Sequence, residues 1–174
     1  VGAILDERSG ADRFSGVVLL AQGDQVVFHE ARGLSSIEYG TANHLGTRFN
    51  LGSINKLFTR VAIGQLAENG RLALDDTIEK FLSGYANREA AQNVSIRQLL
   101  DMTSGIGDFF GNKFEETPKD RIRGLADYLP FFASEPLLFE PGSQRRYSNG
   151  GYIVLGLIVE KVSGQDYFDY VRDH

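Results

Sequence analysis

The sequence lacks cysteine, and histidine is scarce. Without cysteine the chain cannot contain a disulfide scaffold, a thiolate zinc site or a cysteine nucleophile. Its histidines, His29, His44 and His174, lie far apart and show no metal-binding spacing, which argues against a histidine metal site. The glycine-containing segments match neither a P-loop nor a dinucleotide-binding fingerprint, and a G-x-S-x-G nucleophile elbow is missing. Several common enzyme classes are therefore excluded.

Long hydrophobic runs and an excess of positive charge are also missing. The longest apolar stretch, Tyr152 to Val159, is far too short to cross a bilayer, so we expect no membrane span. Charged residues from Asp6 to Arg8 interrupt any signal peptide at the N-terminus. The 18 basic and 23 acidic residues give a net charge of -5, which argues against nucleic acid as a partner.

What is present is the composition of a folded protein. Hydrophobic residues make up 42% of the chain and charged residues 24%, with both signs interspersed, which excludes low-complexity disorder. A chain of 174 residues can bury a sizeable core.

Two apolar runs near the N-terminus predict a β-hairpin. They cover residues 16–21 and 25–31, with a Gln22-Gly23-Asp24 break between them. The first run is continuously apolar, which predicts a strand buried on both faces. We expect a short helix before the hairpin, over residues 2–14, and a loop after it, over residues 33–46.

The rest of the chain is predicted to be mostly helical. Apolar residues recur at helical spacing over residues 54–67, and Asn69-Gly70 supplies a stop. Ser95 is a candidate N-cap for a helix over residues 96–102. A further apolar helix is expected over residues 151–162. Shorter helices are expected over residues 77–82 and 125–133, and from Tyr167 onward.

Ser53-Ile54-Asn55-Lys56 is the first candidate for chemistry. Ser53 lies where the long helix begins, and Lys56 follows one turn later on the same face. A serine becomes a nucleophile when a neighbouring base takes its proton, and a shielded lysine can be that base. The helix N-terminus favours a developing oxyanion. Taken alone, the same spacing is typical of an N-cap serine followed by a solvated lysine.

Tyr147-Ser148-Asn149 is the second candidate. A phenol beside a cation can share in proton transfer, and an asparagine amide can bridge a substrate carbonyl and the lysine. The alternative is a tyrosine packed against a turn with an asparagine cap. Tyr85-Ala86-Asn87 has the same spacing. The later motif is preferred because Pro141-Gly142 precedes it and a helix opens directly after it.

The two candidates occur in order within a recognisable frame. The frame contains motifs on which the family assignment depends: Phe14-Ser15-Gly16-Val17-Val18, Phe49 to Thr59, Leu74-Asp75-Asp76, Ile96 to Gly105, Pro141-Gly142, Tyr147 to Tyr152, Leu155-Gly156 and Val162-Ser163-Gly164. With these motifs the chain resembles the serine β-lactamase and penicillin-binding protein superfamily. Within it, the chain is most similar to the branch of class C β-lactamases, D-aminopeptidase-like enzymes and family VIII carboxylesterases.

The resemblance implies an α/β (α+β) fold of the β-lactamase/transpeptidase type, with an antiparallel sheet flanked by helices and an all-helical region. It implies that Ser53 is the acylated nucleophile, Lys56 the adjacent base, Tyr147 the second proton-transfer group and Asn149 the substrate-binding amide. No metal or organic cofactor is implied. The substrates would be small esters, β-lactams or peptides, with an esterase or peptidase favoured, and the location would be extracytoplasmic. The alternative is a penicillin-recognising module without turnover.

One departure from the family pattern concerns the third motif, a Lys-Thr-Gly or His-x-Gly strand. Nothing like it follows Asn149. In the family that strand supplies one of the two oxyanion donors, and loss of one donor typically costs about 10²–10³ in kcat. An inactive fragment is therefore a further alternative. We therefore expect residues 1–174 to be the N-terminal portion of one catalytic domain, with the first helix and hairpin in residues 1–50 and a mostly helical region in residues 51–174. We also expect an apolar sheet edge that is either exposed or paired with the missing C-terminal segment or another chain.

Overall fold

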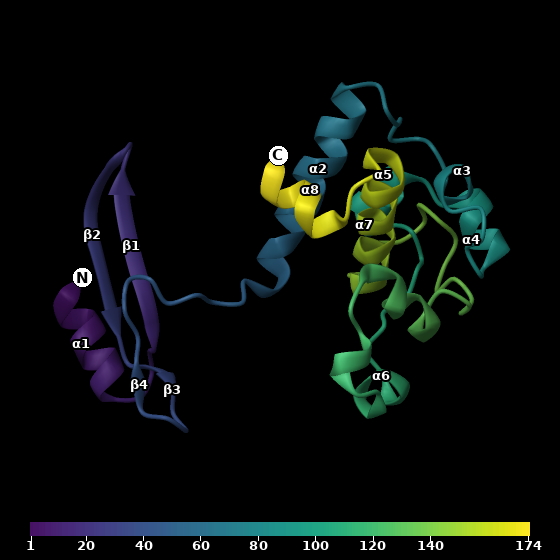
Figure 1. The fold of residues 1–174 in the computed structure, drawn as a ribbon. Helices are drawn as coiled ribbons and strands as arrows, with labels where there is room; N and C mark the ends of the chain where they lie inside the picture. The colour runs from purple at the N-terminus through teal and green to yellow at the C-terminus, as the bar shows by residue number, and fades with distance from the viewer. The chain divides into compact units, whose positions relative to one another are not determined.

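A computed structural model describes residues 1–174 and divides the chain into two compact units, residues 1–51 and residues 52–174. Figure 1 shows both units, and their relative placement is not determined. None of the helices has the length and apolar content that a membrane crossing needs.

The first unit contains the predicted hairpin. Strands β1 (Gly16–Gln22) and β2 (Gln25–Arg32) pair antiparallel, and helix α1 (Gly2–Gly10) contacts β2. The helix is shorter than predicted, because the backbone turns at Asp12, which has a positive φ of 52°. The predicted loop over residues 33–46 is partly wrong, since β3 (Leu34–Ser36) and β4 (Thr41–Ala42) form a second small antiparallel sheet there.

The prediction that the first strand is buried on both faces is wrong. Leu19 and Leu20 of β1 are 52% and 41% exposed, and Val26 and Val27 of β2 are exposed as well. The sheet contains only these two strands, and helix α1 leaves these apolar side chains exposed. The 174-residue chain thus leaves these apolar side chains exposed, and pairing of the sheet edge with a further segment or another chain stays a prediction.

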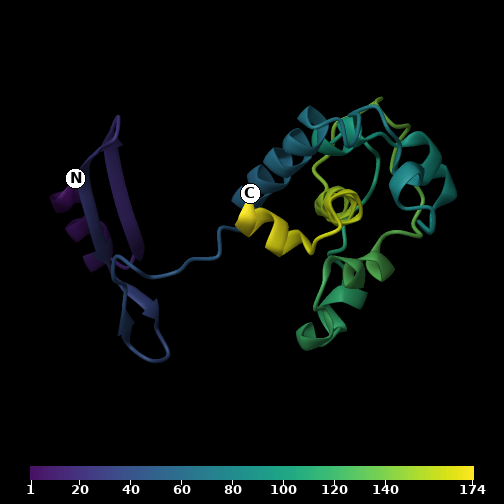
Figure 2. The same cartoon turned by 45° about the horizontal axis from the view of Figure 1, so that its top comes forward.

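The second unit is helical, and helix α7 (Asn149–Ser163) lies at its centre. Helices α2 (Asn55–Glu68), α3 (Ile78–Phe81), α5 (Ile96–Leu100) and α8 (Tyr167–Asp173) and the 3₁₀ segment η3 (Leu125–Phe131) all contact it. Figure 2 looks along α7 and shows these segments around it. The predicted helices are confirmed in position, although residues 125–131 form a 3₁₀ helix rather than an α-helix. Helices α4 (Arg88–Asn93) and α6 (Asn112–Glu116) and the short η1 (Gly52–Ile54) and η2 (Lys119–Arg121) complete the unit.

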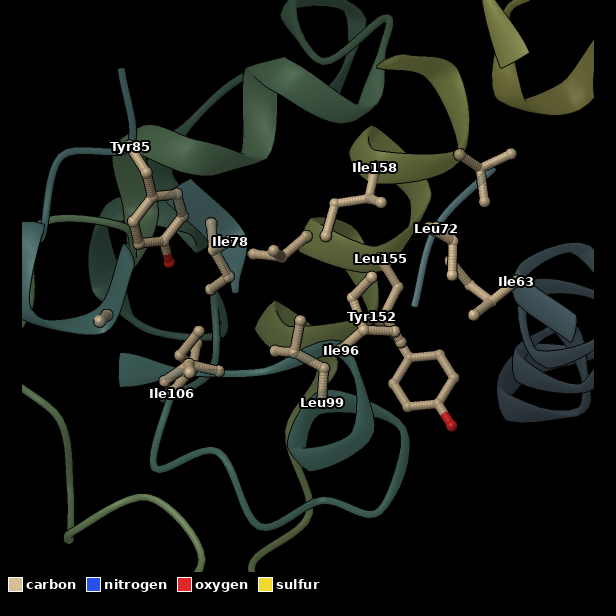
Figure 3. Packing of buried hydrophobic residues seen from close by; sticks show 14 of the residues in the cluster. Ile63, Leu72, Ile78, Tyr85, Ile96, Leu99, Ile106, Tyr152, Leu155 and Ile158 are labelled. Carbon is tan, nitrogen blue, oxygen red and sulfur yellow. The ribbon is translucent and has the colours of Figure 1, made fainter. Parts of the chain in front are cut away.

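Local signals explain where several of these helices begin and end. Ser95 and Gln98 form a capping box at the start of α5, which satisfies backbone amides that a helix N-terminus leaves unpaired. Gly164 ends α7 in the left-handed conformation, a typical helix stop. Helix α7 is apolar on nearly all sides because it is surrounded by other elements. Figure 3 shows Leu155 and Ile158 of this helix among Ile78, Ile96 and Leu99.

Candidate active site

The start of α2 brings Ser53 and Lys56 together. Ser53 lies in the 3₁₀ turn η1, which runs directly into α2, and Lys56 follows in the first turn of that helix. The Lys56 ammonium lies 3.4 Å from Ser53 Oγ. Ser53 is exposed and Lys56 is half-buried, so the hydroxyl is open to a substrate while the amine is shielded.

Tyr147 is positioned by two chain segments that run side by side. Three backbone hydrogen bonds of 2.8, 2.8 and 2.9 Å join them, from the amides of Leu138, Gly142 and Arg146 to the carbonyls of Gly105, Thr103 and Met102. Met102 has a positive φ of 63°, which turns the chain sharply after α5. The segment after Pro141-Gly142 is thus held against the loop that follows α5, and Tyr147 lies at its end.

The start of α7 holds Asn149. Ser148 Oγ accepts a hydrogen bond from the Gly151 amide at 2.9 Å, which caps the helix, and donates one to the Gly107 carbonyl at 2.8 Å. At Gly150, a Cβ atom would lie 2.5 Å from the Gly107 carbonyl oxygen. Only glycine allows this approach, so the loop and the first turn of α7 pack directly against each other.

These elements bring all four predicted residues together. Ser53 Oγ lies 2.6 Å from the Tyr147 hydroxyl, and Lys56 Nζ donates a 2.6 Å hydrogen bond to Asn149 Oδ1. The ammonium also lies 4.7 Å from the centre of the Tyr147 ring and 5.4 Å from that of Tyr152. The hydroxyl of Ser53 therefore lies close to both a phenol and a cation.

This environment changes the pKa of the Tyr147 phenol. Desolvation raises its pKa, but interactions with Lys56 and Ser53 lower it by more, so the pKa lies below the ordinary value of a tyrosine. A nearby cation favours the phenolate, and an acceptor of this kind can take a proton from a hydroxyl within hydrogen-bond reach.

The sequence did not point to Asp108, which lies behind Asn149. Its Oδ2 accepts hydrogen bonds from the Asn149 amide at 3.1 Å and from Asn149 Nδ2 at 2.8 Å. The residue follows the Ile96–Gly105 motif in a glycine-containing loop, where a carboxylate usually faces solvent. Asp108 finds its partner in α7, 41 residues further along the chain, and such a distant contact has no local sequence pattern that would predict it.

The competing Tyr85-Ala86-Asn87 motif has a structural role. Tyr85 is 8% exposed and belongs to the core. Asn87 caps α4 by accepting from the Ala90 amide at 2.9 Å, and its Nδ2 donates to the Glu135 carbonyl. Neither residue belongs to the cluster around Ser53. The chain also brings together no group of three His, Asp or Glu side chains that could hold a metal ion.

Comparisons with known proteins identify the family of the chain. The family model described as Beta-lactamase matches residues 1–174. Penicillin-binding protein 4* of Bacillus subtilis (strain 168) is 33% identical over 162 residues, which cover 92% of this chain and 35% of that protein. The crystal structure of a penicillin binding protein from Bacillus halodurans has a TM-score of 0.85 and 34% identity, covering 97% of this chain and 52% of that one.

A third similar structure is that of EstCE1, a hydrolase with promiscuous acyltransferase activity. Its TM-score is 0.80 at 26% identity, and the match covers 99% of this chain and 48% of that one. The chain thus spans about a third of the curated relative (35%) and about half of the solved chains (52% and 48%). These superpositions confirm the predicted β-lactamase/transpeptidase-like fold.

Proposed function

The chain belongs to the β-lactamase family, and on that premise we propose that it carries the nucleophile of a serine hydrolase that acts through an acyl-enzyme. The observation that supports this most is the position of Ser53 Oγ, 2.6 Å from the Tyr147 hydroxyl and 3.4 Å from Lys56 Nζ. A serine hydroxyl close to a phenol and an ammonium has a group that can accept its proton and a positive charge that stabilises the resulting anion.

In the proposed reaction, Ser53 Oγ attacks the carbonyl carbon of an ester or amide. The resemblance implies Lys56 as the adjacent base, but the shorter distance from Ser53 Oγ favours Tyr147 as the first acceptor of the serine proton, with Lys56 as the cation that stabilises the phenolate. The bond from the carbonyl carbon to the leaving group then breaks, and the leaving group takes that proton. In the second step water attacks the acyl carbon and the bond to Ser53 Oγ breaks. The hydroxyl of the water leaves with the acid, and its other proton goes to Ser53 Oγ.

Two further groups would support this reaction. The backbone N–H of Ser53 lies where η1 runs into α2, and amides at such a helix start can stabilise the oxygen that becomes negatively charged. Asn149 would present an N–H from its side chain to a substrate oxygen while its Oδ1 accepts from Lys56.

For the substrate class we favour an esterase or peptidase-like activity over a dedicated β-lactamase, and we propose an extracytoplasmic location. The likeness to EstCE1, described as a hydrolase with acyltransferase activity, supports an acyl-transferring site. The relatives named penicillin-binding proteins support a second candidate, a module that recognises penicillin without turnover.

Covalent labelling of the full-length protein tests the nucleophile. We expect a fluorophosphonate and a fluorescent penicillin to add their acyl or phosphonyl mass, and we expect Ser53→Ala to abolish both adducts. Ser134→Ala is the matched control, because Ser134 is an exposed serine outside the cluster. If the unmodified protein acquired no adduct, or if Ser53→Ala retained it, the proposal would be wrong.

Turnover separates the two candidates. A hydrolase loses the penicillin adduct with time and releases product from a nitrophenyl ester or a cephalosporin, and the faster of the two substrates shows the preferred class. A recognition module keeps its adduct and releases no product.

A further inference from the structure

The carboxylate of Asp108 is surrounded by N–H donors and has no cation beside it. Oδ2 accepts from the backbone amide of Asn149 at 3.1 Å and from its Nδ2 at 2.8 Å. Oδ1 accepts from the backbone amides of Phe109 at 2.8 Å and Phe110 at 3.4 Å. None of the ion pairs in the chain involves Asp108. Oδ2 thus faces the start of α7 and the Asn149 side chain there, while Oδ1 faces the loop that contains Asp108.

That side chain connects the carboxylate to the cation of the site. Asn149 donates to Asp108 with Nδ2 and accepts from Lys56 with Oδ1, at 2.8 and 2.6 Å. An ammonium can only donate hydrogen bonds and an ionised carboxylate can only accept them. If the carboxamide were turned by 180°, its NH₂ group would face Lys56 and its oxygen would face Asp108. Both contacts would then be repulsive, so Asp108 and Lys56 together permit one orientation.

We propose that Asp108 is a positioning residue that fixes the orientation of the Asn149 carboxamide. This inference rests on the proposed acyl-transfer function of the same site. One N–H of the Asn149 side chain binds Asp108, which leaves the other to meet a substrate oxygen, while Oδ1 keeps the Lys56 ammonium beside Ser53 and Tyr147. Without Asp108, Lys56 alone orients the carboxamide, and both the substrate contact and the position of Lys56 are less firmly fixed.

Kinetics of Ser53 labelling in the full-length protein test the proposal. We expect Asp108→Leu, which removes all acceptors, to slow labelling by a fluorophosphonate about 10²-fold, since small displacements in a reacting site have effects of that size. Asp108→Asn keeps one acceptor oxygen and should lose less. Asp120→Asn is the control for charge, because Asp120 is exposed and no hydrogen bond of its side chain is seen; it should label at the unmodified rate.

A second measurement does not depend on catalysis. In protein with ¹⁵N-labelled asparagine, the Asn149 side-chain proton that binds Asp108 should exchange slowly with water. It should exchange at least tenfold faster in Asp108→Leu or, if that variant does not fold, in Asp108→Asn. The pH dependence of labelling is a further readout. The negative charge of Asp108 raises the pKa of Tyr147, so Asp108→Asn should shift the pH dependence of labelling to lower pH.

The outcomes separate this inference from the proposed function. If the unmodified protein is not labelled, the proposed function fails, and amide exchange alone decides the role of Asp108. If the protein is labelled but both Asp108 variants label at the unmodified rate, or if Asn149 exchange is unchanged, Asp108 is not a positioning residue.

Discussion

At the scale of single residues, the sharpest feature is the Tyr147 phenol beside Ser53. Its pKa is lowered because Lys56 and Ser53 favour the phenolate by more than desolvation opposes it. If Tyr147 accepts the serine proton, labelling of Ser53 should speed up as pH rises through a pKa below about 10, the ordinary tyrosine value. We expect Tyr147→Phe to remove this pH dependence and to slow labelling about 10²–10⁴-fold.

Lys56→Met tests the cause of the shift. This variant keeps a long side chain and removes the positive charge, so the pKa of Tyr147 should return toward its ordinary value. The phenolate absorbance of Lys56→Met, taken against that of Tyr147→Phe, measures this directly. If the Tyr147 pKa were unchanged in Lys56→Met, the assigned role of the cation would be wrong.

The residues of the candidate site differ in how well the sequence predicts them. Ser53 and Lys56 lie three residues apart where η1 runs into α2, so local helical geometry is enough to bring them together. Tyr147 and Asn149 reach them only through tertiary contacts, and the motif resemblance rather than any spacing pointed to them. Asp108 carries neither kind of signal, because its partner lies 41 residues away on another element.

At the scale of elements, the close contact between the loop at Gly107 and the start of α7 holds the site together. A Cβ at Gly150 would lie 2.5 Å from the Gly107 carbonyl oxygen and 2.9 Å from the Phe132 ring. Gly150→Ala should therefore displace the loop and destabilise the protein by about 1–3 kcal/mol, with slower Ser53 labelling. Chemical denaturation and the labelling rate measure the two effects.

Gly64→Ala is the matched control for that substitution. Gly64 lies inside α2, and a Cβ there would meet nothing within 4 Å. Alanine has the higher helix propensity, so this variant should be more stable by up to about 1 kcal/mol. Equal effects of the two substitutions would show that the contact with Gly107 is unimportant.

The elements that the sequence predicted are those with strong local signals. The hairpin has two β-branched runs and a glycine turn, α2 has a helical repeat with a stop, and α5 has a capping box. Strands β3 and β4 have three and two residues, and α4 and α6 have six and five. Segments this short carry too little periodicity to be recognised by it. Helix α5, with five residues, is equally short and was predicted from its Ser95 N-cap instead.

At the scale of the whole molecule, the hydrophobic core belongs to one unit. All residues of the core cluster lie in residues 52–174, where α7 contributes Val154, Leu155, Ile158 and Val159. In residues 1–51, Leu5 is the only buried large hydrophobic residue, and the apolar side chains of β1 and β2 are exposed. A two-stranded hairpin is marginally stable by itself, so the two units should differ widely in stability.

Hydrogen exchange of the 174-residue chain measures that difference. Amides of residues 154–159 in α7 should be protected to the level of global unfolding, because the helices packed around α7 must move away before its hydrogen bonds can break. Amides of residues 17–20 and 26–28 in the hairpin should exchange much faster, since little buried apolar surface opposes their opening. Equal protection of both segments would contradict this expectation. Hairpin protection that rises with protein concentration would instead show that a second copy pairs with the open sheet, because edge strands with unpaired backbone groups bind other strands.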